Sequence, residues 1–531
     1  MENQSVTPRA SFAERDVALL ERASVCNDSL RGFRQERERC KRFTYGDQWI
    51  DPVEDSGASM REEEYIRRQG NVPLKNNLIR RLVRNVLGVY RDRMEMPRCV
   101  ARDPAECPMA ATVNVLLSYN AEANRLDELY ARSMEEFLIS GLVVHKKWYG
   151  PRGGVSDCHT DMISPERFFF DTSSRDVRGN DVAMVGEVHE MAFDELCATF
   201  ARKPEDIVRL SQIFGAPLTE SRTACRVIEV WERRRPMRLR CHDRLHGRSL
   251  ELDSSKIAAI ERLNARRRSE LLPEMEMEWV FDDVWQYFFL APDATVLSRG
   301  TSPYAHGSHP YVFKAYPYVD GEIHSFVSDI IDQQKLTNRL ISMYDWILRA
   351  SAKGVLLFPE GSLPDGVDIN DVAEEWSRFN GVIVFRPRPG VPLPQQVSSK
   401  SADIGITQLL EIQMKMMEDI SGVNGALQGR VESGAMSGTL YDSQTRNSLT
   451  ALSDILRSFN DFTRRATAVD ASNLRQFYSQ ARIEAIVGGR PGFACALDES
   501  RNFFFSGFDF SVITPAENEP QGGNVVSESA E

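Results

Sequence analysis

Residues 309–340 read HPYVFKAYPYVDGEIHSFVSDIIDQQKLTNRL, and this stretch decides the fold. Its first part, YVFKAYPYV at 311–319, is rich in the aromatic and β-branched residues that favour a strand. From Glu322 to about Ala352 apolar residues recur at helical spacing, which predicts a long amphipathic helix. The apolar residues of this helix are Ile323, Phe326, Val327, Ile330, Ile331, Ile341, Tyr344 and Leu348. The change from strand to helix separates a mixed N-terminal part of the chain from a mainly helical C-terminal part.

A compact module follows the long helix. It begins with a predicted strand, GVLLF at 354–358, and continues after a Pro/Gly turn with a short helix at about 370–379. A second predicted strand, GVIVF at 381–385, ends at the proline-rich stretch RPRPGVPLP at 386–394. The order is that of a small inserted β-α-β module.

Two further helices flank a glycine- and serine-rich loop. We expect helices at about 402–421 and 440–478, because apolar residues recur there at helical spacing. Seven of the eighteen residues at 422–439 are Gly or Ser, which favours a loop. Residues 479–514 remain for a small C-terminal unit, and the composition of 515–531 is typical of disorder.

The part of the chain before residue 309 mixes helical and strand patterns. Residues 1–42 are polar, with a helical stretch at about 13–22, and we interpret them as a peripheral arm. Helices are predicted at about 62–69, 71–93, 110–141 and 256–268, and strands at 141–150, 164–171, 182–191, 226–234 and 279–291. This pattern predicts an α+β fold.

Composition and charge restrict the class of protein. With 531 residues, 42% of them hydrophobic, the chain can bury a large core, and it lacks both a secretory signal pattern and the roughly 20-residue apolar run of a membrane span. We therefore expect a soluble protein without a membrane partner. The net charge of −12 argues against a protein that grips DNA by neutralising many phosphates, but it permits loose passage of DNA.

The sequence does not predict an enzyme, a cofactor or a metal. We find no G-x-x-x-x-G-K-[ST] loop, no G-x-S-x-G elbow and no H-E-x-x-H pair. Cys158 and His159 are adjacent, and adjacent residues in a strand point to opposite faces, so the two could not readily form a catalytic pair there. Cys241, His242 and His246 form one local group without a second ligand pair, which is a weak zinc signal. The nine scattered cysteines indicate reduced thiols.

Four segments, in this order, resemble those of phage portal proteins, also called head-to-tail connectors, and especially portals of short-tailed double-stranded-DNA phages. FTYGDQW at 43–49 with NVPLKNNLIRRLVRNVLGVYRDR at 71–93 is similar to the family's aromatic-GDQW segment and its N-L-I helix ending in G-x-x-R. Residues 164–196 are similar to the family's strand ending in Asp, S-R-D turn and strand leading into a helix.

The two remaining segments lie in the C-terminal half. Residues 309–340 resemble the start of the first stem helix, including D-x-Q followed by Asn338. Residues 421–452 resemble the end of the second stem helix, the tunnel loop and the start of the long wing helix. The resemblance covers about 43–478, and the short C-terminus departs from relatives that carry a long helical barrel.

The resemblance implies a portal-type fold with an α/β wing, a two-helix stem, a β-α-β clip, a long return helix and a short crown. The implied parts are an N-terminal arm (1–42), wing (43–320), stem helix 1 (321–353), clip (354–401), stem helix 2 (402–421), tunnel loop (422–439), long wing helix (440–478), crown (479–514) and disordered tail (515–531).

The resemblance also implies a function. Portal proteins form dodecameric rings at a capsid vertex, and double-stranded DNA passes through the channel without sequence specificity during packaging and ejection. The implied partners are terminase, the major capsid and scaffolding proteins, and the tail adaptor protein. We expect the chain in the virion, and in the host cytoplasm during assembly. The alternative is another virion structural protein, such as a head-tail adaptor or a capsid-internal protein.

Residues of the tunnel loop are the candidates for the DNA channel. Arg430 and Glu432 are its only charged residues, so each subunit would make one weak phosphate contact, or the two would pair with the loop of a neighbouring subunit. Gly434, Met436, Ser437 and Gly438 would give the loop flexibility and a smooth surface. The candidates for docking terminase and the adaptor lie in the clip, because aromatic and arginine side chains often anchor interfaces. They are Trp376, which could instead fill the module's core, Arg378, Arg386 and Arg388.

Overall fold

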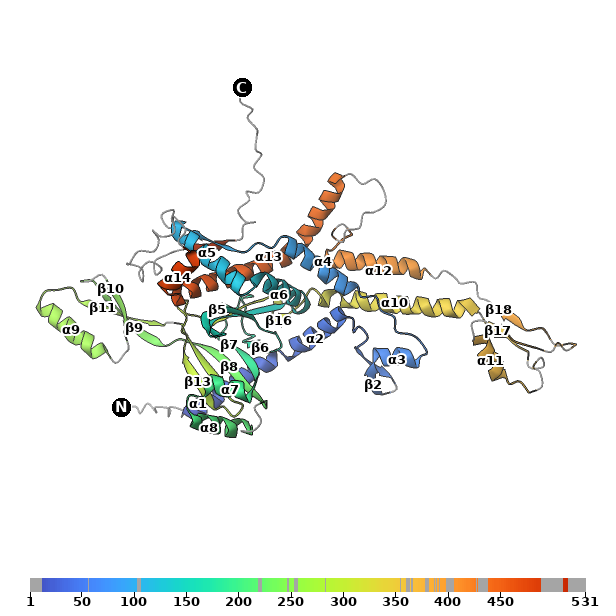
Figure 1. The fold of residues 1–531 in the computed structure, drawn as a ribbon, viewed down its shortest axis with the longest axis horizontal. Coiled ribbons are helices and arrows are strands. Elements are labelled where there is room, and N and C mark those ends of the chain that lie inside the picture. Colours follow the sequence, from blue (N-terminus) through green and yellow to red (C-terminus); the bar gives the residue numbers. More distant parts are fainter. Residues whose placement is uncertain are drawn as a thin grey trace, which may run out of the picture. The chain divides into compact units, whose positions relative to one another are not determined.

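The computed structural model describes residues 12–488 and 510–513, with gaps at 56, 103–106, 218–221, 246–247, 253–255, 282, 354, 360–362, 364–365, 378–381, 386, 388, 391, 398–404, 426 and 428–437. Helices and strands both contribute extensively (Figure 1), which confirms the predicted α+β class.

The described helices are α1 (Phe12–Ser29), α2 (Arg31–Tyr45), α3 (Glu62–Arg68), α4 (Leu78–Asp92), α5 (Cys107–Ala123), α6 (Leu126–Ser140), α7 (Phe193–Phe200), α8 (Pro204–Phe214), α9 (Ile257–Ser269), α10 (Ser328–Lys353), α11 (Ile369–Ser377), α12 (Ile406–Ser421), α13 (Gly438–Phe477) and α14 (Gln480–Val487).

The described strands are β1 (Pro52–Asp55), β2 (Ala58–Arg61), β3 (Arg98–Ala101), β4 (Leu142–Arg152), β5 (Val155–Met162), β6 (Phe168–Phe170), β7 (Met184–Ala192), β8 (Ala224–Arg234), β9 (Met237–Asp243), β10 (Arg248–Leu252), β11 (Met275–Phe281), β12 (Val284–Leu290), β13 (Val296–Thr301), β14 (Tyr311–Ala315), β15 (Tyr318–Val319), β16 (Glu322–Ile323), β17 (Val355–Leu357), β18 (Gln395–Val397) and β19 (Phe510–Ile513).

The chain divides into two compact units. Unit 1 comprises residues 1–41, 83–328 and 435–531, and unit 2 comprises residues 42–82 and 329–434. Each unit is therefore built from segments that are far apart in the sequence.

Two antiparallel sheets organise unit 1. One has five strands in the order β13-β12-β8-β7-β6, and the other has three in the order β14-β4-β5. Phenylalanines 168–170 of β6 are fully buried, and they belong to one apolar core with Leu142 of β4 and Phe313 of β14. Helix α1 adds Leu19 and Ala23 to this core. The helix is longer than the predicted stretch at 13–22, and it has a buried face.

Helix α13 packs on the three-stranded sheet of unit 1. Lys147 of β4 is fully buried, and its Nζ lies 2.6 Å from Oδ2 of Asp470 on α13. The same Nζ donates to Thr160 Oγ1 at 2.9 Å. Helices α5 and α14 pack beside α13 (Figure 1) around a second apolar core. A buried ion pair thus fixes the long helix against the sheet.

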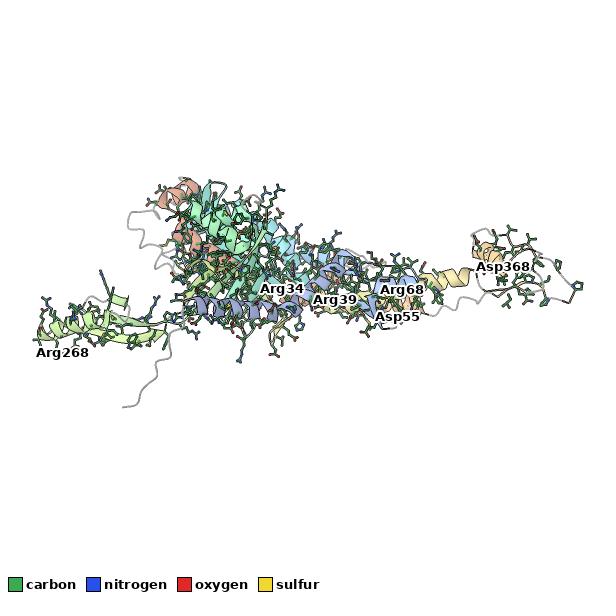
Figure 2. The ribbon with its side chains drawn as sticks, turned by 90° about the horizontal axis from the view of Figure 1, so that it is seen from below. Arg34, Arg39, Asp55, Arg68, Arg268 and Asp368 are labelled. Carbon is green, nitrogen blue, oxygen red and sulfur yellow. The ribbon has the colours of Figure 1, made fainter. Side chains whose placement is uncertain are left out.

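A smaller layer of unit 1 consists of the sheet β10-β9-β11 and helix α9. This is the helix predicted at about 256–268, and it covers the sheet with Ile260 and Arg267. Arg267 binds both carboxylate oxygens of Asp243, at 2.7 and 2.8 Å. Arg268 lies on the exposed side (Figure 2) and pairs with Glu274.

Unit 2 contains α10, α12, the hairpin β1–β2, helix α3, and the sheet β17–β18 with α11. Asp368 precedes α11 (Figure 2), and its backbone N–H donates to Asp371 Oδ2 at 3.0 Å, which is the N3-to-N-cap bond of a capping box. The described order β17-α11-β18 is β-α-β, but its second strand is not the one that the sequence predicted.

The second strand of this module was predicted at the wrong place. Residues 382–385 of the predicted strand are not a strand in the structure, and β18 at Gln395–Val397 pairs with β17 instead. The residues of GVIVF favour a strand locally, but strand formation requires a partner edge, which local composition does not specify.

Three other predictions needed correction at element boundaries. The predicted strand 279–291 is two strands, β11 and β12, in different sheets. The helical region 110–141 is two helices, because Arg125 adopts a left-handed φ of 47° between them. The helix predicted from Glu322 begins at Ser328, because Asp320 and Gly321, with φ of 50° and 90°, turn the chain into the β15–β16 hairpin.

The long helix predicted at 440–478 is α13, Gly438–Phe477. Among the helices that the structure describes, none is long and apolar enough to cross a lipid bilayer.

Candidate assembly site

A buried glutamine of α10 organises unit 2. Gln334 is fully buried, and its Oε1 accepts hydrogen bonds from the backbone N–H groups of Leu78 and Ile79 at 2.9 and 3.2 Å. These groups lie in the first turn of α4, where no intrahelical acceptor exists. The Nε2 of Gln334 donates to the backbone oxygen of Asn76 and to Asn338 Oδ1, at 2.7 and 2.9 Å. One side chain of α10 thus caps the start of α4 and is itself fully bonded.

The network continues to the segment at 43–49. Asn338 Nδ2 donates to Gln48 Oε1 at 2.8 Å, and Gln48 Nε2 donates to the backbone oxygen of Phe43 at 3.0 Å. The aromatic-GDQW segment, the N-L-I helix and the D-x-Q segment with its asparagine therefore meet in one buried network. The sequence identified these motifs by resemblance, and their shared hydrogen bonds appear only in the folded chain.

Two ion pairs surround this network. Lys335 on α10 binds the carboxylate of Asp51, and Arg339 Nε lies 2.9 Å from Glu62 Oε1. The Glu62 side chain is almost entirely buried. Helix α10 is therefore held by polar contacts over its first three turns, and Ser342 further along accepts a hydrogen bond from the backbone N–H of Leu74 at 3.1 Å.

Helix α12 carries an apolar stripe that is exposed. Leu409, Ile412, Met416 and Ile420 are spaced by three, four and four residues, so they lie on one face of the helix. Each side chain is 46–50% exposed, whereas Met417 on another face is buried. We call these four residues the α12 stripe. Aligned apolar side chains of this kind are typical of a surface that another protein covers.

The second half of α10 is also apolar and exposed. Met343, Trp346 and Leu348 are about half exposed, and so is Tyr344. The sequence placed Tyr344 and Leu348 mostly on one face with Ile330, and in the structure Ile330 is buried whereas Tyr344 and Leu348 are exposed.

Most of the predicted functional residues lie outside the described residues. This holds for Arg430, Glu432, Gly434, Met436 and Ser437 of the predicted tunnel loop.

Gly438 is the first residue of α13 rather than part of the loop. In the predicted clip, Arg378, Arg386 and Arg388 also lie outside the described residues. Trp376 lies on α11 and is half-buried.

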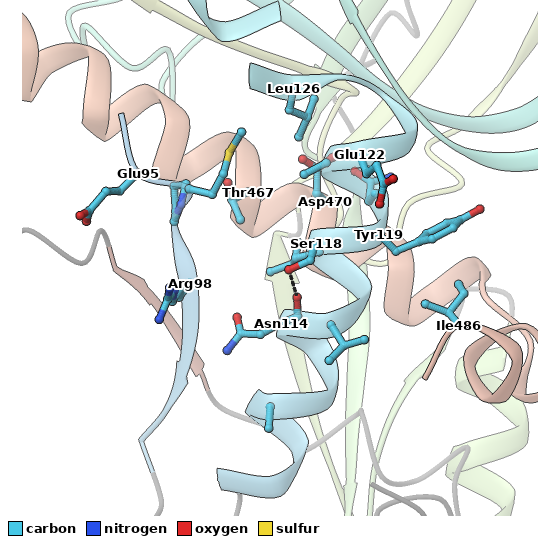
Figure 3. Close-up of a pocket in the computed structure, with 17 residues that line it drawn as sticks. Glu95, Arg98, Asn114, Ser118, Tyr119, Glu122, Leu126, Thr467, Asp470 and Ile486 are labelled. Carbon is cyan, nitrogen blue, oxygen red and sulfur yellow. Dashed lines mark hydrogen bonds between the residues drawn. The ribbon is translucent and has the colours of Figure 1, made fainter. Parts of the chain in front are cut away.

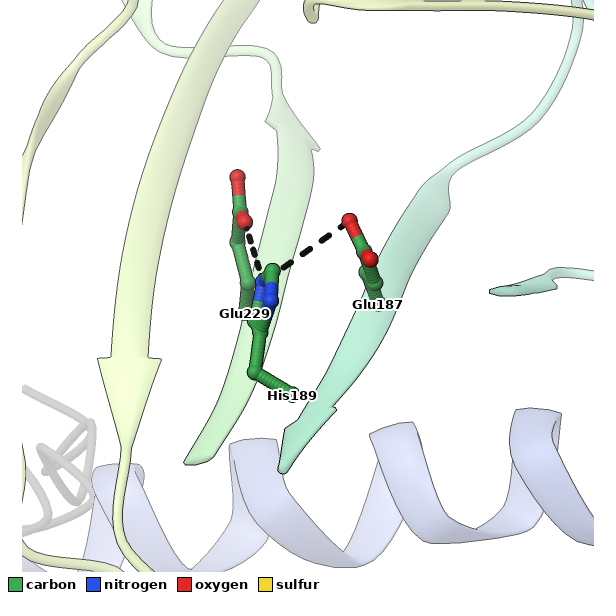
Figure 4. A group of neighbouring side chains, drawn as sticks. All are labelled: Glu187, His189 and Glu229. Atoms are coloured by element: carbon green, nitrogen blue, oxygen red, sulfur yellow. Dashed lines mark hydrogen bonds and ion pairs between the residues drawn. The ribbon is translucent and has the colours of Figure 1, made fainter. Parts of the chain in front are cut away.

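One group of side chains resembles a metal site but contains its own cation. Glu187, His189 and Glu229 lie close together on β7 and β8 (Figure 4). Lys146 Nζ is 2.5 Å from Glu229 Oε2 and 3.7 Å from Glu187 Oε2. Glu229 also accepts a hydrogen bond from Trp231 Nε1 at 2.8 Å. Burial raises the pKa of Glu187, and for Glu229 the attraction of Lys146 and the His189 bond outweigh burial and lower the pKa. The group is a buried charge network in the sheet.

A cavity of about 990 Å3 lies in unit 1 beside α5 and α13 (Figure 3). Several of its polar side chains make structural bonds. Asn114 exchanges two hydrogen bonds with the backbone of Cys99, and Asp470 pairs with Lys147. Asn120 donates to the backbone oxygen of Cys158 at 2.9 Å. This lining does not form a nucleophile with its base.

The cysteine and histidine candidates also have structural surroundings. Cys158 is buried in an apolar core, and burial raises the pKa of its thiol, which disfavours a thiolate nucleophile. Its neighbour His159 packs against Trp148 instead. Cys241 is buried beneath α9, whereas His242 is exposed, and His246 lies outside the described residues.

The described residues thus show buried polar networks and two helices with exposed apolar side chains. The family model of the phage P22-like portal protein matches residues 20–492, most of the chain. The chain belongs to this family, which confirms the resemblance seen in the sequence and makes the protein a structural component of the virion. No curated protein sequence matches the chain.

Proposed function

We propose that this protein is the subunit of a ring at the capsid vertex, through which double-stranded DNA is packaged and ejected. The observation that carries the proposal is the exposed α12 stripe together with the exposed end of α10 in unit 2. Exposing this many apolar side chains to water is unfavourable, and a neighbouring subunit that covers them would remove them from water. A ring that closes by rotation provides every subunit with the same two neighbours. Family membership supports this arrangement, and we expect twelve subunits by resemblance.

The proposed parts follow the order of the chain. Helices α10 and α12 would be the stem, the module containing β17, α11 and β18 the clip, residues 43–320 the wing, α13 the long wing helix, and residues 479–514 the crown. The loop between α12 and α13 would form the narrowest part of the channel. The clip would dock terminase during packaging and the tail adaptor afterwards, and the wing would face the capsid and scaffolding proteins.

Assembly can be tested with native mass spectrometry and negative-stain microscopy of the full chain. The wild type should give a twelve-fold ring with an open channel. The double variant Ile412→Asp/Met416→Asp should remain monomeric, because it introduces two charges into the α12 stripe. Lys415→Asp is the matched control, since Lys415 is an exposed neighbour outside the stripe. Rings of the double variant as stable as those of the wild type would refute the role of this surface.

The same measurement distinguishes the proposed portal ring from the alternative function. A head-tail adaptor or a capsid-internal protein would give a monomer or a ring of another order. A wild-type monomer under all assembly conditions would therefore favour the alternative.

The channel would let DNA pass through without binding it tightly. The net charge of −12 disfavours the multiple phosphate contacts that make binding tight and salt-dependent. In the tunnel loop, Arg430 and Glu432 would contact DNA weakly or pair with a neighbouring loop. Replacing Gly434 and Gly438 with proline should impair packaging of DNA into capsids, and unimpaired packaging and retention would contradict a role for loop flexibility.

The proline-rich clip stretch is the proposed docking surface. Arg386→Glu with Arg388→Glu should weaken terminase binding, because the change removes the two arginine side chains proposed as anchors and reverses their charge. Arg378 and Trp376 are further candidates, although the Trp376 side chain is half-buried within the module. Unchanged terminase binding by the double charge reversal would exclude the arginines as anchors.

A further inference from the structure

Another cavity of unit 1, of about 400 Å3, lies between α1 and the strands β8, β12 and β13. The charged residues described in its lining are Arg15 and Asp16 of α1, Arg234 of β8 and Arg299 of β13. Positive charges therefore outnumber negative ones in this lining, although the whole chain has a net charge of −12. A cleft that is lined mainly by one sign of charge attracts ligands of the opposite sign. The lining of this cavity therefore favours an anionic ligand.

The register of the five-stranded sheet places two of the arginines on one face with an aromatic ring. Arg299 lies opposite Phe288 of β12, and Arg234 lies opposite Val284 of the same strand. Opposite residues of antiparallel strands, and alternate residues of one strand, project from the same face. Leu19 of α1 lines the cavity together with these side chains. Because β8 and β13 flank β12, the two arginines approach the cavity from either side of β12.

Arg234 is held in position before any ligand binds. Its Cζ lies 5.6 Å from the centre of the Phe288 ring, and its Nε lies 2.8 Å from Glu232 Oε2. Arg22 of α1 binds the other carboxylate oxygen of Glu232 at 2.7 Å. Phe288 is itself buried in the apolar core, so its ring gives the cavity a fixed apolar floor. An arginine that is already positioned loses less side-chain freedom when it binds an anion.

The size and position of the cavity suit a protein segment better than duplex DNA. Its volume lies in the range of roughly 300–1,000 Å3 that is typical of small-molecule sites, whereas DNA-binding surfaces bury roughly 1,000–2,500 Å2. The cavity also reaches β13, an end strand of its sheet, where Arg299, Gly300 and Thr301 all line it. An extended peptide can lie along the edge of a sheet. The cavity can therefore take a few side chains of such a peptide.

We propose that this cavity binds an acidic segment of a partner protein. A carboxylate of the segment would lie between the guanidinium groups of Arg234 and Arg299, because arginine binds carboxylates through two parallel hydrogen bonds. A neighbouring apolar side chain of the segment would pack on Phe288. Arg15 would add a further positive charge beside the carboxylate. All of these residues belong to unit 1, so the proposal does not depend on the ring.

Fluorescence anisotropy of a labelled peptide mixed with the full chain tests the proposal. The probe is a peptide of alternating glutamate and leucine, and the matched probe has glutamine in place of each glutamate. The acidic peptide should bind at least about tenfold more tightly, and its affinity should fall as salt is added, because the contacts are ion pairs. Equal binding of the two peptides, or no binding of the acidic one, would overturn the proposal.

Variants of the arginines locate the binding. Arg234→Gln/Arg299→Gln should weaken binding of the acidic peptide by at least about tenfold. Arg152→Gln/Arg266→Gln is the matched control, because it removes the same charge from exposed positions outside the cavity, and it should bind like the wild type. Equal losses in the two double variants would indicate unspecific attraction and refute the site.

Two further measurements complete the test. Arg299→Lys keeps the positive charge but not the planar guanidinium group, so its loss of affinity should be intermediate. Arg299 is exposed on an end strand, so this variant keeps the test valid if the double variant fails to fold. A short DNA duplex that binds more tightly than the acidic peptide, with the same dependence on Arg234 and Arg299, would assign the cavity to phosphates and overturn the proposal.

Discussion

Replacing Gln334 with leucine should uncouple α10 from the start of α4. The N–H of Ile79 would lose its acceptor outright, and a buried unpaired donor costs about 1–3 kcal/mol. Leu78, Asn76 and Asn338 would each lose one of two partners, because Leu78 N–H also donates to the Asn76 oxygen and Asn76 N–H to Asn338 Oδ1. Leucine recovers part of this loss by apolar burial. We expect a net cost of about 3 kcal/mol.

Urea unfolding of the full-length monomer and amide exchange in the first turn of α4 would measure this cost. At about 1.4 kcal/mol per factor of ten, exchange at residues 78–80 should become faster on the order of a hundredfold. Gln333→Leu is the matched control, since this neighbouring glutamine is only half-buried and its side chain is outside the network. A change below about 0.5 kcal/mol for Gln334→Leu, or an equal cost for both variants, would refute the capping role.

Three further predictions concern unit 1. Lys147→Met should cost about 3–5 kcal/mol in urea unfolding, because it leaves Asp470 buried without its cation, and adding Asp470→Leu should restore most of that stability. Because burial raises the pKa of Asp470 and lysine no longer offsets it, the deficit of Lys147→Met should shrink as the pH falls; a deficit independent of pH would contradict this account. Burial lowers the pKa of His309 to about 3, so the unfolded chain binds a proton more readily, and the free energy of unfolding should fall by roughly 2 kcal/mol from this residue between pH 7 and pH 5. The variant His309→Asn should lose that part of the acid sensitivity, and an unchanged pH profile would argue against it. Gly141→Ala should prevent stable folding of unit 1, because a Cβ would lie 1.8 Å from the backbone oxygen of His324 at a φ of 75°, and a wild-type melting temperature would disprove this.

The family and the fold class could be predicted from the sequence because both depend on the spacing of apolar residues within segments and on the order of these segments along the chain. Apolar spacing predicted α13 to within two residues at its start, since a helix closes its own hydrogen bonds. The order of helix, β-α-β module, helix, loop and helix indicated a portal protein, and the family match confirmed it. The residues proposed for the channel and for docking stay predictions.

Tertiary structure alone decided which of these local patterns found partners. Residues 382–385 have strand composition, yet β18 took the place beside β17, because pairing depends on an edge that is distant in the sequence. Gln334 has no feature that distinguishes it from Gln333 in composition, and only folding buries it against the start of α4. The α12 stripe could be read as a core face, since periodicity shows that apolar residues share a face but not what covers it. In this protein the sequence set the elements, and contacts between distant segments set which surfaces remain open for a neighbouring subunit.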